Sequence, residues 1–154
     1  MRTTALVALA LILAACARPD LTGPPQVAFG RQECARCGMI ISEERYAAGY
    51  VSETGQSVAY DDVGELLAVL SKQPGLSARA WVRDFNGQGW VRAKEASFVV
   101  SPGLATPMGS GMAAFADSAR AAEFSQARAA GPVRAFSQVI DNPDGAGAHL
   151  LDER

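Results

Sequence analysis

Residues 57–75 read SVAYDDVGELLAVLSKQPG and carry the pattern that decides the fold. The first four of them are typical of a strand, and an aspartate, the residue type preferred at a helix N-cap, follows at position 61 and again at 62. Apolar residues then recur at helical spacing, at Val63, Leu66, Leu67 and Leu70. Pro74 and Gly75 end the pattern. The stretch therefore predicts a strand that leads directly into an amphipathic helix.

A hairpin is predicted just before this junction. Residues 46–52 carry strand-forming residues, and the four residues 53–56, with a glycine among them, separate them from the strand of residues 57–60. After the helix, residues 78–85 predict another strand that ends at Asn86 and Gly87. The order of this first unit is therefore strand, strand, helix, strand.

The second half of the chain repeats this order. Its predicted elements are strands over 96–100 and 112–115, a helix over 117–130 and a closing strand over 133–139. Tyr60 and Asp62 before the first helix match Phe115 and Asp117 before the second at the same offset. We therefore predict an α+β fold of two similar ββαβ-type units, a pseudo-repeat that forms one compact body.

The first 15 residues are typical of a signal peptide. Arg2 supplies the positive start, a short apolar run follows, and Leu13-Ala14-Ala15-Cys16 resembles a bacterial lipobox. In a lipobox the cysteine is lipidated and becomes the first residue of the mature protein, so Cys16 is predicted to anchor the protein to a membrane. An ordinary secretory peptide, cleaved after small residues, is the alternative.

The rest of the chain divides into a tether, a folded domain and a tail. Residues 16–32 are rich in Pro, Gly and polar residues and are predicted to be a lipidated N-terminal tether. The domain is expected over residues 33–140, with its two units over about 33–85 and 90–140. Residues 141–154 are polar and Gly-rich and predict a flexible C-terminal tail.

The composition excludes some classes of function. The chain has 14 Lys and Arg against 16 Asp and Glu, a net charge of −2, and it contains no basic run, so nucleic acid is not an expected partner. It also contains no nucleophile elbow, no phosphate-binding loop after a strand and no paired-carboxylate motif. No catalytic residue is therefore assigned, and the protein is not expected to be an enzyme.

Two sulfur-rich motifs carry the chemistry. Residues 34–39 read CARCGM, and residues 106–112 read TPMGSGM in a turn-rich setting. Thiolate and thioether donors select soft metal ions, copper(I) above all. Zinc is disfavoured, because a structural zinc site usually has four Cys or His ligands, and a second C-x-x-C motif or a pair of histidines is missing. The two motifs together predict one copper(I) site.

Several residues in these motifs have alternative interpretations. Cys34 and Cys37 could form a structural disulfide in an oxidising compartment, or act as a redox pair. The β-rich residues that follow them favour a metal-binding loop over the strand-to-helix setting of redox motifs. Met112 is a further candidate ligand, but it also opens a predicted strand, where it would fill the core. Asp61 and Asp62 are predicted to be a helix cap and its neighbour rather than catalytic acids.

The lipobox, the two sulfur motifs and Tyr60-Asp61-Asp62 together resemble the NosL family of nitrous oxide reductase accessory lipoproteins. The resemblance extends from about residue 33 to about residue 140. It implies two ββαβ-like units and a periplasmic copper(I) chaperone, held to a membrane by lipidated Cys16. This chaperone would deliver copper for assembly of the copper centres of nitrous oxide reductase, together with an ABC-type membrane maturation complex. The copper ligands implied by the resemblance are Cys37, Met39 and Met108, with Cys34 as a further candidate.

Two other functions use the same thiols. NosL-like domains resemble organomercurial lyase in fold, so a thiol-disulfide oxidoreductase or a thiol-dependent lyase acting through Cys34 and Cys37 is the main alternative. Such an enzyme would not need the second methionine motif. A passive lipoprotein with a structural disulfide is the third hypothesis, in which reduction would destabilise the fold and added metal would have no effect.

Overall fold

The computed structural model describes residues 20–87 and 89–141. The signal peptide predicted over residues 1–15, the lipidation site predicted at Cys16 and nearly all of the tail predicted over 141–154 lie outside these residues. The strands are β1 (Ala48–Val51), β2 (Ser57–Tyr60), β3 (Ala80–Arg83), β4 (Trp90–Arg92), β5 (Ser97–Val100), β6 (Met112–Phe115) and β7 (Arg134–Ala135). The helices are α2 (Val63–Lys72), α3 (Ser118–Ala127) and α4 (Phe136–Asp141), with short 3-10 helices at Glu44–Tyr46, Pro74–Arg79 and Ala93–Glu95. Within the described ranges, no helix combines the length and the apolar character needed to cross a membrane.

The first sheet has four antiparallel strands in the order β2-β1-β3-β4. The predicted hairpin is confirmed, because β1 pairs with β2 from Ala48 opposite Tyr60 to Val51 opposite Ser57. Strand β3 adds to the other side of β1, as the strand expected near residues 78–85. The sequence analysis missed β4, which is only three residues long and shows no buried–exposed alternation.

The second sheet has three antiparallel strands in the order β6-β5-β7. The two sheets share one arrangement. In the first, β1 lies between its hairpin partner β2 and β3, the strand that follows α2; in the second, β5 lies between its hairpin partner β6 and β7, the strand that follows α3. The internal repeat itself stays a prediction. The closing strand predicted over 133–139 is wrong beyond residue 135, because residues 136–141 form α4. Phe136, Val139 and Ile140 are spaced as on one helix face and pack against the core.

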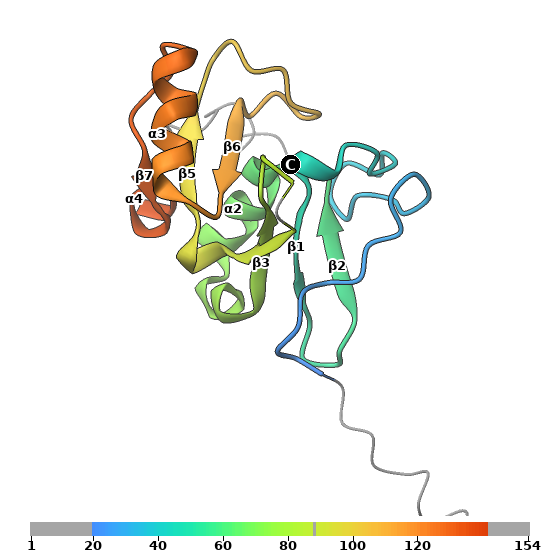
Figure 1. The fold of residues 1–154 in the computed structure, drawn as a ribbon. Helices are drawn as coiled ribbons and strands as arrows, with labels where there is room; N and C mark the ends of the chain where they lie inside the picture. The colour runs from blue at the N-terminus through green and yellow to red at the C-terminus, as the bar shows by residue number, and fades with distance from the viewer. Residues whose placement is uncertain (1–19, 88, 142–154) are drawn as a thin grey trace, which may run out of the picture.

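Helix α2 joins the two sheets into one body. It contacts β1 and β2 of the first sheet, β6 of the second, and α4. Figure 1 shows α2 and β3 between the β1–β2 hairpin and the β5–β6 hairpin, with α3 on the outer side of the second sheet. One buried cluster extends through both sheets and α2, and it includes Tyr60, Leu66, Leu70, Phe98 and Met112. The predicted α+β class is therefore confirmed.

The described part of the predicted tether packs against the domain. The backbone N–H of Gln26 donates to the Ser57 hydroxyl at 2.8 Å, and Val27 and Phe29 pack against the main core. The Arg92 guanidinium donates to the Thr22 carbonyl at 2.8 Å. The folded body therefore begins about ten residues before position 33, because two apolar side chains within a Pro- and Gly-rich segment attach it to the first sheet.

Candidate metal centre

The first sulfur motif folds into a tight loop that is closed by its own backbone. The Cys34 N–H donates to the Met39 carbonyl at 2.7 Å, and the Gly38 N–H donates to the Cys34 carbonyl at 3.0 Å. Gly38 has a φ of +74°, in the left-handed region that residues with a side chain rarely adopt. Glu33 and Ile40 pair across the base of the loop. The chain therefore reverses within a few residues and presents both thiols on one side.

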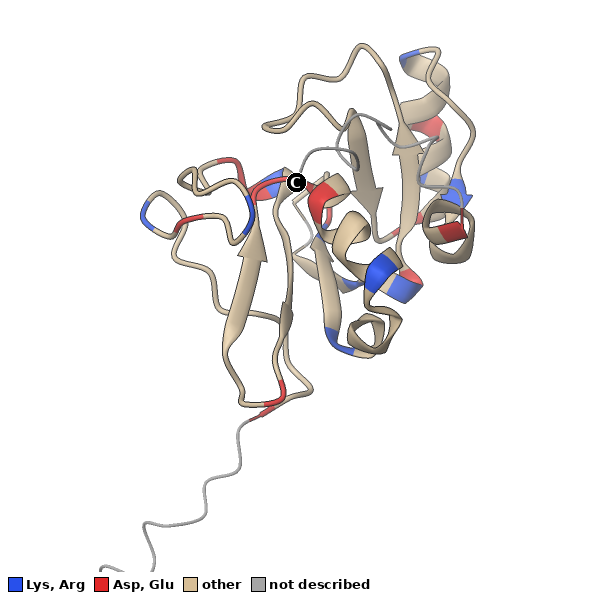
Figure 2. Cartoon of the chain, turned by 180° about the vertical axis from the view of Figure 1, so that it is seen from behind, with Lys and Arg blue, Asp and Glu red and all other residues tan. Residues whose placement is uncertain are grey.

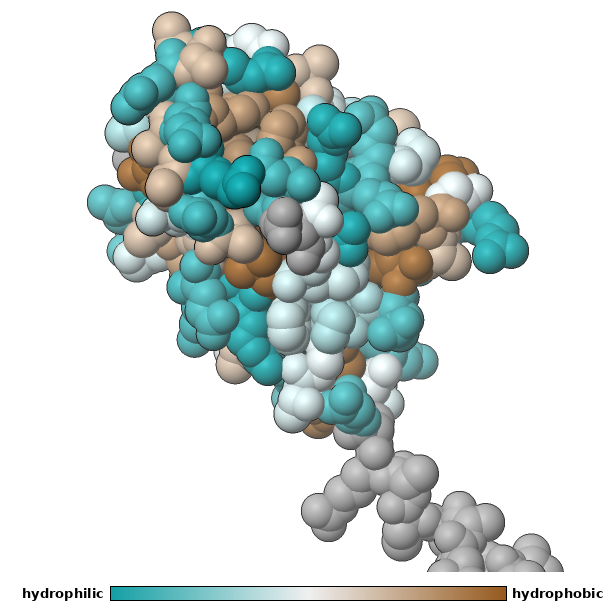
Figure 3. Space-filling model, viewed as in Figure 1, coloured by the Kyte–Doolittle hydropathy of each residue, from teal (hydrophilic) through white to brown (hydrophobic). Residues whose placement is uncertain are grey.

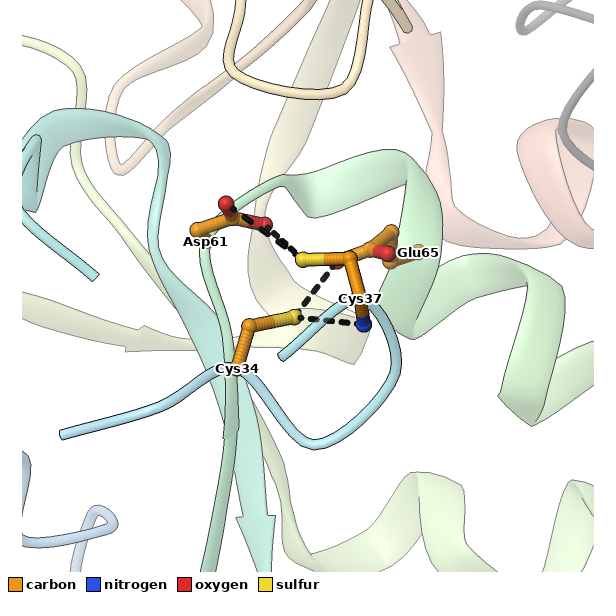
Figure 4. A group of neighbouring side chains, drawn as sticks. All are labelled: Cys34, Cys37, Asp61 and Glu65. Atoms are coloured by element: carbon orange, nitrogen blue, oxygen red, sulfur yellow. Dashed lines mark hydrogen bonds between the residues drawn. The ribbon is translucent and has the colours of Figure 1, made fainter. Parts of the chain in front are cut away.

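The loop lies beside the start of α2. The Ala35 N–H donates to the Ala59 carbonyl at 2.8 Å, which fixes the loop to the end of β2. The Cys34 thiol donates to Glu65 Oε2 at 2.9 Å, and the Cys37 thiol lies 3.6 Å from Asp61 Oδ1. Figure 4 shows the two thiols and the two carboxylates facing one another. Their four ligand atoms all lie within 4.8 Å of one another, so this cluster could hold one metal ion.

Asp61 and Glu65 are the members of this cluster that the sequence analysis did not identify. It treated Asp61 and Asp62 as a cap and its neighbour, and the structure shows that Asp62 is the cap, because its carboxylate accepts from the Gly64 N–H at 2.8 Å. Asp61 instead faces Cys37. A signal was present in the spacing, because residues four apart around a helix N-terminus face the same side, and Glu65 interrupts the apolar positions of α2.

Burial controls the protonation of the cluster. Cys34 is 3% exposed and Glu65 is 1% exposed. Burial raises the pKa of Cys34 well above its usual range and also raises the pKa of Cys37. The pKa of Glu65 is raised to about 7, mainly by burial and in addition by the neighbouring carboxylates of Asp61 and Asp62, against the lowering effect of the hydrogen bond from Cys34. Both thiols are therefore protonated at neutral pH without metal, and a bound metal ion must displace their protons.

The Glu65 carboxyl predicts a pH dependence of stability for the metal-free protein. Its pKa rises from 4.5 to about 7 on folding, so above pH 4.5 the unfolded state binds fewer protons at this group. Stability should fall as the pH rises from about 4.5 through 7, by about 3 kcal/mol in total. Glu65→Gln should remove this loss. Urea unfolding at pH 5 and pH 8.5 measures it, and an equal pH dependence in both proteins would contradict the prediction.

The second sulfur motif reaches the same end of α2 through Asp62. The loop between β5 and β6 places the Met108 N–H 3.1 Å from Asp62 Oδ2. Asp61, the residue before Asp62, belongs to the thiol cluster, which consists of Cys34, Cys37, Asp61 and Glu65. The structure therefore brings the backbone of Met108 to the helix turn that carries the cluster. Met112 is fully buried in β6 as part of the main core, and its role as a metal ligand stays a prediction.

Met39 lies on the exposed side of the first loop. Met39 and Ile40 are each 46% exposed and are the large apolar residues that the described surface exposes most. Figure 3 shows a brown patch at the right edge of the molecule, over the loops that precede β1 in Figure 1. Figure 2 shows acidic residues on the start of α2 nearby. Apolar atoms therefore cover the outer side of the loop, and carboxylates lie on its inner side.

A surface pocket among the described residues lies apart from the thiol cluster. It has a volume of about 470 Å³ and is lined by residues 42–45 and 83–87. Three carboxylates and two guanidinium groups are mixed in its wall, and neither cysteine lines it. This arrangement favours no single class of ligand, so the thiol cluster is the stronger candidate site.

Comparisons with known proteins agree on the fold. A family model described as NosL matches residues 26–142. The crystal structure of the copper chaperone NosL from Shewanella denitrificans is similar to this structure, with a TM-score of 0.61 and 21% sequence identity. The match covers 75% of this chain and 96% of that chain. No curated protein matches the chain. At this identity, the structural likeness establishes the arrangement of helices and strands.

Proposed function

The chain belongs to the NosL family, and we propose on that basis that it is a copper(I)-binding chaperone rather than an enzyme. In this proposal it works in the periplasm, held to a membrane by lipidated Cys16. It delivers copper for assembly of the copper centres of nitrous oxide reductase, together with an ABC-type membrane complex. A copper chaperone that shares its fold supports the proposal.

One observation carries the metal-binding part of the proposal. Cys34 and Cys37 are both free thiols and lie beside the start of α2. At the same place, Asp62 accepts a hydrogen bond from the backbone N–H of Met108. Copper(I) is a soft ion, and thiolates with a thioether bind it while discriminating against hard cations. We take Cys37, Met39 and Met108 as the copper ligands, with Cys34 as a further donor.

The burial of the donors suits a protein that must release its metal. Cys37 is half-buried and Met39 is exposed, whereas Cys34, Asp61 and Glu65 are buried. A partner can approach copper from the Cys37 and Met39 side and exchange ligands with it there. The buried side chains close the site on its inner side, where Cys34 is the further donor and the two carboxyl groups lie beside the thiols.

Two other functions use the same cluster. The carboxylates of Asp61 and Glu65 complete a set of two sulfur and two oxygen donors, which would also accept zinc. Zinc is therefore the second candidate cargo. A thiol oxidoreductase or lyase is less well supported, because its nucleophile is a thiolate and burial raises the pKa of both thiols.

A competition titration with matched methionine variants tests the proposal. Met108→Leu and Met112→Leu each remove one thioether at nearly constant side-chain volume. Under anaerobic conditions and with a chelator of known affinity, the native protein should bind one copper(I). Met108→Leu should weaken binding by about tenfold or more. Met112→Leu separates the two interpretations of that residue: unchanged affinity assigns Met112 to the core in which it is buried, and a similar loss makes it a ligand.

Other outcomes of this titration separate the hypotheses. No copper(I) binding by the native protein would overturn the chaperone function. Copper(I) binding that is indifferent to Met108→Leu would keep the function and reject Met108 as a ligand. Tight zinc binding with weak copper(I) binding would favour the second cargo. Delivery is tested separately, by transfer of copper from the loaded protein to metal-free nitrous oxide reductase in the presence of the membrane complex.

A further inference from the structure

We propose that Asp62 is the positioning residue that holds Met108 at the copper site. This inference rests on the proposed function, because it concerns how the second sulfur motif joins the first. Asp62 lies between the two motifs in space. It is the N-cap of α2 and directly follows Asp61 of the thiol cluster. It accepts hydrogen bonds from the methionine loop, residues 106–110 between β5 and β6.

The Asp62 carboxylate gathers donors from both halves of the chain. Oδ1 accepts from the Gly64 N–H at 2.8 Å and from the Ser110 hydroxyl. Oδ2 accepts from the Thr106 hydroxyl at 2.6 Å, the Met108 N–H at 3.1 Å and the Ser110 N–H at 3.4 Å. Four of these five donors belong to residues 106–110. One carboxylate therefore attaches the whole methionine loop to the end of α2.

The charge of Asp62 is essential to this role. Its side chain is fully buried, and a buried carboxylate is costly unless hydrogen bonds surround it. An ionised carboxylate offers acceptor sites only, and the loop supplies only donors to it. Asparagine would place an N–H₂ group opposite some of these donors, so the loop would lose bonds although the side chain keeps its size.

Capping alone does not require this arrangement. The cap of α2 uses only the bond from Gly64. Asp117 caps α3 in the same way, accepting from the Ala119 N–H at 2.7 Å, but it is exposed and lies beyond the opposite end of β6 from the loop of residues 106–110. Asp117 is therefore a matched control, a helix cap of the same residue type with no methionine loop attached.

The close packing of the loop on α2 supports the same role. A Cβ atom added at Gly64 would lie 2.5 Å from the Ser110 Cβ. The loop therefore rests directly on the first turn of α2, where only glycine leaves room for it. Because the loop is already fixed in the folded protein, its backbone at Met108 loses no further conformational entropy when copper binds. Folding has already met that entropic cost.

A double-mutant cycle tests the positioning role. Copper(I) affinity is measured by chelator competition for the native protein, Asp62→Asn, Met108→Leu and the double variant, with Asp117→Asn as control. Asp62→Asn should weaken binding by about 10- to 100-fold, as the loss of a group that orients a metal ligand does. Asp117→Asn should not change the affinity. The double variant should bind no more weakly than Met108→Leu alone, because Asp62 acts through Met108.

Two results would overturn the positioning role and leave copper binding intact. In the first, Asp62→Asn weakens binding by the same factor with and without Met108, so that the carboxylate acts independently of it. In the second, neither variant changes the affinity. Failure of the native protein to bind copper(I) would instead refute the proposed function. If Asp62→Asn does not fold, Thr106→Val removes one bond to Asp62 from a partly exposed position, and the same cycle is run with it.

Discussion

Cys37→Ala should weaken copper(I) binding by at least about a thousandfold, a loss of about 4 kcal/mol. Cys37 is the half-buried thiol of the pair, it lies 3.6 Å from Asp61, and the resemblance to the family places it among the metal ligands. Its removal leaves Cys34 as the remaining thiol of the pair, and Cys34 is buried and hydrogen-bonded to Glu65. An anaerobic competition titration against a strong copper(I) chelator measures the loss.

The carboxylates of the cluster provide the control for this result. Asp61→Asn and Glu65→Gln keep the side-chain shapes but remove the charges, and for a soft ion their effect should be small compared with that of Cys37→Ala. Thermal unfolding of the metal-free proteins checks that each variant still folds. Equal losses of copper(I) affinity from the thiol and from the carboxylates would show that the carboxylates hold the metal as strongly as Cys37 does, against the expectation for a soft ion. Unchanged affinity in Cys37→Ala would remove this thiol from the site.

The parts of the fold that sequence reasoning predicted are those with strong local signals. The hairpin of residues 48–60 and helices α2 and α3 combine turn residues, apolar spacing and Asp caps within short stretches. Strand β7 and helix α4 were not separable, because a two-residue strand and a six-residue helix are too short for either period to show. The attachment of residues 22–32 depends on contacts with distant strands, which local patterns do not contain.

The candidate site divides in the same way. The two thiols were predictable, because donor type and C-x-x-C spacing are local properties. The approach of the methionine loop to them was inferred from chemistry and stays a prediction; the structure attaches the backbone of that loop to Asp62, the residue that follows Asp61 of the thiol cluster. Asp61 and Glu65 were missed, because acidic residues at the start of a helix usually cap it or favour its dipole. That Asp61 and Glu65 face the thiols follows only from the packing of residues 34–39 against β2, a contact between segments distant in the sequence.

Oxidation of Cys34 and Cys37 to a disulfide should abolish copper(I) binding, and reduction should restore it fully. Both sulfur atoms belong to a cluster within 4.8 Å, and a sulfur–sulfur bond of about 2 Å requires the side chains to close this gap. Oxidised glutathione would take up the two electrons and two protons released, giving two molecules of reduced glutathione. The sulfur atoms would then have no thiolate to offer the metal.

The rate of this oxidation distinguishes the metal-free protein from the loaded one. Burial raises the pKa of both thiols, so little thiolate is present at neutral pH to attack the disulfide of oxidised glutathione. Oxidation should therefore accelerate as the pH rises. Bound copper(I) should protect both sulfur atoms. A thiol assay during incubation with oxidised glutathione measures the rate, and Cys34→Ala, which cannot form the internal bond, is the control. Oxidised protein that still binds copper(I) as tightly as the reduced form would show that the thiolates are not ligands, and the metal site would then have to be built from the methionines and carboxylates alone.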